Sequence, residues 1–346
     1  MSTGRYIHPL ESRSMVKTEE SLSIVVPIFN EQEVISYFHQ RLLTSLTKTN
    51  VDNVEIIYIN DGSTDTSLHL LLNLQEKDFR IKIIDLSRNF GKEAAMTAGL
   101  EHATGEAVVV IDADLQDPPE LIDEMVKEWR CGYDVVNMRR LSRQGDTRLK
   151  KITAGLFYSL MGHIGRVKLP KDVGDFYLLS RQALDAFLQM PERTRFTKGL
   201  FAWIGFPSKE LTYHRNARYA GTSKWNYWSL WNLAIEGITS FTIAPLKISS
   251  YVGTITSLIA LLYGGFMLFK TLILGNPVPG YPSLMVIILF LGGLQLLAIG
   301  VMGEYMGRVF IEIKHRPQYL IKHIHSNLKK DFPTVKAFNV KQEGEL

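Results

Sequence analysis

Before about position 240, apolar residues come in short runs separated by charged and turn-forming residues. The first four runs cover residues 23–28, 55–60, 82–86 and 108–111. Runs of this length without a turn signal are typical of buried strands, and the segments between them suit helices. Strands and helices that alternate in this way predict βαβ units and a mainly parallel sheet, so we expect an α/β fold.

The pattern changes further along the chain, where charged residues disappear from residues 248–269 and 271–302. As a helix, the first stretch would span about 33 Å, against a hydrocarbon thickness of about 30 Å. We therefore expect transmembrane helices at 248–272 and 283–307, joined by a turn rich in Gly and Pro. A buried hairpin of a soluble protein is the alternative, but two adjacent segments of this length are hard to cover in a chain of 346 residues.

Just before the first of these stretches, four aromatic residues precede a series of aliphatic ones. This composition predicts an amphipathic juxtamembrane helix at 225–243, with its aromatic rings at headgroup level. A core helix of the preceding domain is the alternative. The aromatic residues are Trp225, Tyr227, Trp228 and Trp231.

Charge and cysteine content narrow the function classes. The net charge of +4 is too small to argue for nucleic acid as a partner. Basic residues gather in the tail at 308–346, whereas Lys270 is the only charge near the connecting turn, so both termini and the folded domain should lie on the cytoplasmic side of the inner (plasma) membrane. The single Cys131 excludes an internal disulfide. Residues 1–20 lack the apolar core of a signal peptide and are expected to form a disordered leader.

Asp112 and Asp114 follow the fourth apolar run directly, at the sheet edge where open α/β folds bind ligands. On an extended segment both side chains lie on one side, and the bare pair would repel by several kcal/mol at an effective dielectric constant of about 20. A divalent cation removes this cost, and oxygen ligands suit Mg²⁺ or Mn²⁺. Gln116 continues the alternation and could add an amide oxygen. The alternative is a solvated acidic turn that caps a helix beginning near Pro118.

Polar residues also end the first two strands, where Glu31, Asn60 and Asp61 stand. Turn chemistry alone could place them there. Together with Asp112 and Asp114 they predict one crevice that binds a base or ribose and a metal-bound diphosphate. Neither G-x-G-x-x-G after the first strand nor G-x-x-x-x-G-K-[ST] occurs, so the dinucleotide-binding and P-loop classes lose their main support.

Three later segments carry further candidate chemistry. The basic stretch at 139–151 is either a solvated face or a site for headgroups or phosphate. A small turn at 173–176 carries one acid, Asp175. At 218–224 two cations flank a glycine and two hydroxyls, a composition that could close over phosphates as a lid.

Six short motifs follow one another along the chain. They are VPIFNE at 26–31, NDGSTD at 60–65, RNFGK at 88–92, DADLQDP at 112–118, VGDF at 173–176 and RYAGTSK at 218–224. In this order they resemble the motifs of family-2 glycosyltransferases of the polyprenyl-phosphate type, the group that includes dolichol-phosphate mannose synthase. Bacterial bactoprenol glucosyltransferases, which carry two C-terminal membrane helices, are the nearest likeness.

The resemblance implies a GT-A-type, Rossmann-like domain at 21–224 that binds a UDP-sugar donor and a Mg²⁺ or Mn²⁺ ion. It also implies transfer of a hexose, expected to be glucose, to a polyprenyl phosphate in the bilayer, with inversion at the anomeric carbon. It implies nucleotide-sugar contacts from Pro27, Phe29, Glu31, Asp61 and Asp112, metal contacts from Asp112, Asp114 and Gln116, and catalytic roles for Asp114, Asp175, Arg218 and Lys224. Two anions must also be brought together, so we expect cations on the acceptor side, with Arg139 and Arg143 as candidates.

Some alternatives stay open at this point. Asn60 replaces an acid that is common in the family, which makes base or ribose contacts there uncertain. The Q-x-x-R-W signature of processive synthases is absent after Asp175, so a polymerising enzyme is not expected. The sugar could instead be mannose, a modified arabinose or an N-acetylhexosamine. The alternative to an enzyme is a membrane protein that binds a nucleotide without catalysis. A homo-oligomer is also open.

Overall fold

Four apolar strands form the centre of the α/β domain, as the sequence predicts. They are β1 (Ser21–Ile28), β2 (Asn53–Asn60), β3 (Ile81–Leu86) and β4 (Ala107–Val110), and they pair in parallel as β4–β1–β2–β3. The computed structural model describes residues 20–141, 173–190, 192, 197–214, 243–274 and 280–326. Among the predicted segments, the leader up to residue 19 and residues 225–242 of the amphipathic helix lie outside this part of the chain.

Further strands extend this parallel centre on both sides, giving the sheet order β7–β5–β6–β4–β1–β2–β3–β8. On one side, β6 (Val173–Ser180) runs antiparallel to β4 and to β5 (Val135–Arg140), and β7 (Ser208–Tyr213) runs parallel to β5. Residues 173–176 were predicted to be a turn, and this prediction is wrong, because they begin β6. The residues after Asp175, from Phe176 to Leu179, are apolar and buried in the sheet. The strand that they form extends back to Val173 and therefore includes the predicted turn.

Helices cover both faces of the sheet. One face is covered by α1 (Ile35–Leu46), α2 (Ser67–Gln75), the short 3-10 turn η1 (Pro119–Leu121) and α4 (Ile122–Arg130), and the other by α3 (Lys92–Glu101), α6 (Arg181–Leu188) and α7 (Thr197–Ile204). Alternate β1 residues serve the two cores, since Ile24 and Val26 belong to one and Val25 to the other. The first helix begins at Ile35, so Glu31 and Glu33 lie in the loop between β1 and α1.

Close packing of α3 against the sheet brings its first residues to the carboxyl edge of the strands. A Cβ atom added at Gly99 would lie 2.3 Å from Val25 Cγ1 and 2.7 Å from Ile59 Cδ1, so a larger residue could not pack there without a shift. Buried alanines, Ala95 and Ala98, continue this small face. The helix therefore lies directly over β1 and β2, with Lys92 at the carboxyl edge of the strands.

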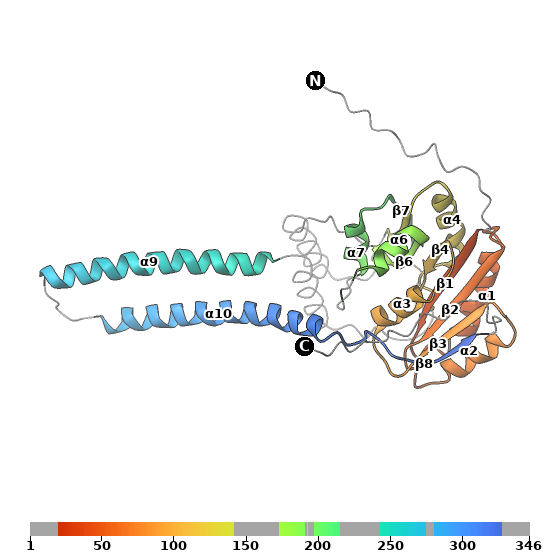
Figure 1. The fold of residues 1–346 in the computed structure, drawn as a ribbon, viewed down its shortest axis with the longest axis horizontal. Coiled ribbons are helices and arrows are strands. Elements are labelled where there is room, and N and C mark those ends of the chain that lie inside the picture. The colour runs from red at the N-terminus through yellow and green to blue at the C-terminus, as the bar shows by residue number, and fades with distance from the viewer. Residues whose placement is uncertain are drawn as a thin grey trace, which may run out of the picture.

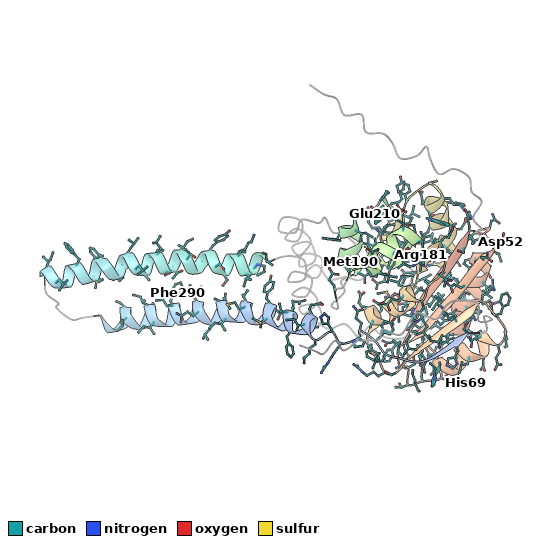
Figure 2. All side chains as sticks on the ribbon, in the orientation of Figure 1. Asp52, His69, Arg181, Met190, Glu210 and Phe290 are labelled. Carbon is teal, nitrogen blue, oxygen red and sulfur yellow. The ribbon has the colours of Figure 1, made fainter. Side chains whose placement is uncertain are left out.

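The two long apolar stretches form α9 (Ala244–Leu274) and α10 (Tyr281–Ile313), which extend side by side away from the α/β domain (Figure 1). Both are long and apolar enough to cross a membrane, over Pro245–Met267 with a mean hydropathy of 1.4 and over Val286–Ile313 with 2.3. Apolar side chains such as Phe290, which is 64% exposed, project from the surface of the hairpin (Figure 2). The two helices are therefore candidate membrane spans.

The chain then returns to the sheet, which the sequence did not indicate. Residues 308–346 were expected to form a basic tail, but α10 continues to Ile313 and β8 (Ile321–Ser326) pairs antiparallel with β3 (Figure 1). The short strand carries Lys322, His323 and His325, so its polar composition hides it from a search for apolar runs. At an exposed sheet edge, polar side chains are an ordinary feature of strands.

Candidate active site

The loops after β1 and β2 bind one another at the carboxyl edge of the sheet. Asn30 has a positive φ of 56°. Its side-chain oxygen accepts a hydrogen bond from the Thr64 backbone N–H at 2.8 Å, and its own backbone N–H donates to Ser63 Oγ at 3.0 Å. The backbone N–H of Glu31 donates to Ser67 Oγ at 3.0 Å. These bonds fix the loop that carries Phe29 and Glu31, the expected nucleotide contacts, and Phe29 is 37% exposed at this edge.

Asp61 fixes the loop between β3 and α3. Its two carboxylate oxygens accept the backbone N–H groups of Phe90 at 2.7 Å and Gly91 at 3.0 Å. Burial raises the pKa of Asp61, and these two hydrogen bonds and Arg88 act in the opposite direction. A nucleotide contact from Asp61 stays a prediction, and the bonds that the structure gives this side chain hold the start of α3 in place.

Asn60 is explained by its neighbour on β3. Its amide nitrogen donates to Asp85 Oδ1 at 2.7 Å within the buried β2–β3 pair, and its oxygen accepts the Ser63 backbone N–H at 3.3 Å. An acid at position 60 would place two carboxylates within hydrogen-bond distance of each other, which is unfavourable in a buried site. The amide at this position therefore matches the carboxylate of Asp85.

Lys92 joins two of the predicted acids. Its Nζ lies 2.6 Å from Asp112 Oδ2 and 2.5 Å from Asp175 Oδ2, so β4, β6 and α3 meet at this ammonium group. Burial raises the pKa of Asp112 to about 6, because the attraction of Lys92 is offset by repulsion from Asp175 and Asp114. Burial alone would lower the pKa of Lys92, but the two carboxylates outweigh it and raise the value.

The backbone after Asp112 turns sooner than the sequence predicts. Leu115 has a positive φ of 61°, and the backbone N–H of Gln116 donates to Asp114 Oδ1 at 3.1 Å. The expected extended alternation of Asp112, Asp114 and Gln116 is therefore wrong, because a turn follows Asp114 and re-aims Gln116. A metal contact from Gln116 stays a prediction.

A second cluster of polar side chains, Asp117, Tyr213 and Arg140, lies beside Asp175. Asp117 is fully buried and accepts a hydrogen bond from the Tyr213 hydroxyl, and Arg140 Nε donates to that hydroxyl at 3.3 Å. A Cβ atom added at Gly174 would lie 2.6 Å from Arg140 Nη2, so the glycine leaves room for the guanidinium next to Asp175. Burial lowers the pKa of Arg140, but Asp117, Tyr213 and Asp175 outweigh it and raise the value.

The arginine that the structure brings to the acids is Arg140, and an acceptor-phosphate contact from the predicted Arg139 stays a prediction. Adjacent residues of a strand point to opposite faces, and Arg139 Nη1 instead lies 3.1 Å from Glu210 Oε2 on the neighbouring strand β7. The other predicted cations, Arg143, Arg218 and Lys224, lie outside the described residues. Sequence reasoning also missed Lys92, although its motif contained a usable signal, a lysine where a helix begins.

The acids fit a divalent cation that arrives with a phosphate ligand. In the part of the chain that the structure describes, no group of three or more His, Cys, Asp or Glu side chains forms a complete metal site. Mg²⁺ usually takes only one or two carboxylates and fills its other positions with water and substrate phosphates. The oxygen-only pair Asp112 and Asp114 matches that requirement.

Comparison with known proteins identifies the family. Residues 23–188 match Glycosyl transferase family 2. The chain is 51% identical over 303 residues to the uncharacterized glycosyltransferase sll0501 of Synechocystis, an alignment that covers 88% of this chain and 95% of that protein. It is 47% identical over 304 residues to the SfII prophage-derived bactoprenol glucosyl transferase of Shigella flexneri, covering 88% and 98% of the two chains. A prophage bactoprenol glucosyl transferase homolog of Escherichia coli K12 is 46% identical over 303 residues, covering 88% and 99%.

These matches confirm the resemblance seen in the motifs, and the mainly parallel sheet confirms the α/β, GT-A-type fold. The chain is a glycosyltransferase that belongs to family 2, among the members that resemble bactoprenol glucosyl transferases.

Proposed function

We propose that the protein transfers a hexose, with glucose as the expected sugar, from a UDP-sugar to a polyprenyl phosphate at the cytoplasmic face of the inner membrane. The observation that carries the proposal is the meeting of Asp112, Asp175 and Lys92 at one sheet edge, in a chain that also has two helices able to cross a membrane. The names of the bactoprenol glucosyl transferase relatives support the lipid acceptor and the glucose.

In the proposed reaction, an acceptor phosphate oxygen attacks the anomeric carbon from the side opposite the donor diphosphate. The new C–O bond forms as the old one breaks, the electron pair leaves with UDP, and the configuration inverts. A divalent ion bound by Asp112 and Asp114 would stabilise the charge that develops on the diphosphate. The residues of the chain hold the two reactants in line.

Asp175 is assigned an orienting role. A phosphate monoester has a second pKa near 6 and already carries about −1.5 to −2 charges at neutral pH, so it needs little help from a base. In the structure the Asp175 carboxylate is already paired with the Lys92 ammonium group, 2.5 Å away. Asp175 would therefore accept hydrogen bonds from the sugar or the acceptor.

The test is transfer from radiolabelled UDP-glucose to polyprenyl phosphate by the full chain in detergent or nanodiscs, with the anomeric configuration of the product determined. Lipid-linked β-glucose that forms with divalent metal and is lost in chelator would support the proposal. The proposal would be refuted if no donor in a panel of UDP- and GDP-sugars supported transfer. If only another hexose were transferred, the proposed reaction would stand and the expected sugar would be wrong. The non-catalytic reading requires donor binding without product.

A further inference from the structure

Lys92 stands at an unusual place for a cation. It is the first residue of α3, where the partial positive charge of the helix N-terminus disfavours a positive side chain. Its position is nevertheless tightly fixed. The preceding Gly91 has a φ of 97°, a conformation that favours glycine, and the backbone N–H of Gly91 is bound by Asp61. Local structure therefore presents a lysine where helix energetics would favour an acid.

The carboxylates facing Lys92 supply the compensating interaction. Asp112 is repelled by Asp114 and by Asp175. The Lys92 ammonium group lies between Asp112 and Asp175. The Lys92 side chain is 40% exposed, against 17% for Asp112. The lysine can therefore leave its partners toward solvent or substrate, whereas Asp112 stays in place at the end of β4.

The same oxygen cannot serve two cations at full strength. Asp112 Oδ2 contacts Lys92 at 2.6 Å, a distance at which a divalent ion on Asp112 would be a close neighbour of the ammonium. A single and a double positive charge this close together repel each other, and the repulsion is stronger in a partly buried site than in water. A donor diphosphate changes this balance, because its oxygens can bind the metal and the ammonium together.

We propose that Lys92 is an internal counter-ion that competes with the divalent metal for Asp112, so that the metal binds tightly only together with the nucleotide diphosphate. This inference rests on the proposed function, which assigns the metal to Asp112 and Asp114. It explains why the metal and the donor would bind together. Without donor, Lys92 neutralises the acids, and with donor, the Lys92 ammonium group binds the diphosphate instead. Metal and nucleotide then strengthen each other's binding, as reciprocal linkage requires.

The test measures Mn²⁺ binding by electron paramagnetic resonance on the full chain in nanodiscs, with and without UDP. Lys92→Gln should tighten Mn²⁺ binding without UDP by about tenfold, because it removes a neighbouring positive charge. It should also reduce the factor by which UDP tightens Mn²⁺ binding. Lys92→Arg keeps the charge and should behave like the wild type.

Matched controls separate charge at this position from charge in general. Lys127→Gln removes a cation that pairs with Asp123 on the surface of α4, and it should leave both affinities unchanged. Asp112→Asn should abolish the Mn²⁺ site. Thermal unfolding of each variant checks that it is folded.

The outcomes distinguish this inference from the proposed function. If Asp112→Asn leaves Mn²⁺ binding unchanged, the proposed metal site is wrong. If Asp112→Asn abolishes binding while Lys92→Gln leaves the donor-free affinity unchanged or weakens it, the competition is overturned and the metal site stands. Tighter donor-free binding in Lys92→Gln together with a smaller effect of UDP is the result expected here.

Discussion

Single side chains at the strand ends organise the loops around the site more than they project into it. Asp61 was predicted from its place after β2, and the structure uses both of its oxygens on the backbone of residues 90 and 91. Such contacts depend on which loops meet in space, and a single sequence does not contain that information. The residue types and the edge where they meet could be predicted, but their hydrogen-bond partners could not.

Asp61→Ala tests this loop-holding role. The change leaves two N–H groups without their acceptor, so we expect the free energy of unfolding to fall by about 1–3 kcal/mol. Because the freed loop leads into Lys92, UDP-sugar affinity should fall as well. Denaturant unfolding and isothermal calorimetry measure the two effects. A variant with normal donor affinity and lowered stability would restrict Asp61 to a purely structural role.

Gly174→Ala tests the position of Arg140. The added methyl group would lie 2.6 Å from Nη2, so the guanidinium must move away from Asp117 and Asp175. Since the end of a flexible side chain gives way, we expect a normal melting temperature and transfer lowered about tenfold or more, in line with the sensitivity of catalysis to positioning.

A double-mutant cycle supplies the control for this prediction. In an Arg140→Ala background, Gly174→Ala should add little further loss, because the clashing group is absent. Fully additive losses of activity would show that the glycine acts through the backbone and not through Arg140.

At the scale of elements, β8 is the largest difference from the predicted organisation. The four parallel strands and the apolar hairpin followed from hydrophobic patterning and charge, since each has a strong local pattern. No such pattern marks β8, whose residues are polar and whose pairing with β3 joins segments far apart in the chain. It binds the loop after β3 directly, because the Ser87 N–H donates to the Leu320 carbonyl at 2.9 Å.

Two truncations test whether this strand supports the site. A chain that ends after Lys314 loses β8 and the Leu320 contact, so we expect a lower melting temperature and weaker UDP-sugar binding. A chain that ends after Ser326 keeps the strand and should match the full chain in both measurements. If the two truncated chains bind donor equally well, β8 has no part in holding the Ser87–Lys92 loop.

At the scale of the whole molecule, β8 constrains how the hairpin sits. Since β3 and β8 share one sheet, the chain before α9 and the chain after α10 must lie on the same side of any membrane that the hairpin crosses. The sequence predicted this arrangement from charge alone. A chain cut off after about residue 241 would lose β8 together with the hairpin, so it could not test the hairpin alone.

A cleaner test replaces residues 244–313 with a flexible linker and keeps β8. Donor binding should stay close to that of the full chain, whereas turnover with long-chain polyprenyl phosphate in vesicles should fall by at least tenfold, because the acceptor phosphate is no longer presented at a fixed membrane distance. Turnover with a short, water-soluble prenyl phosphate is the control and should persist. Equal losses with both acceptors would contradict the positioning role of the hairpin.

The pairing of β8 with β3 also has a consequence for biosynthesis. Synthesis proceeds from the N-terminus, so β3 keeps a bare edge while some 230 residues, including both apolar helices, leave the ribosome. Exposed strand edges invite pairing between nascent chains. Among the described strands, β8 can join the sheet only after the hairpin has been made. If the hairpin enters lipid as it is made, that step comes before β8 covers the edge of β3.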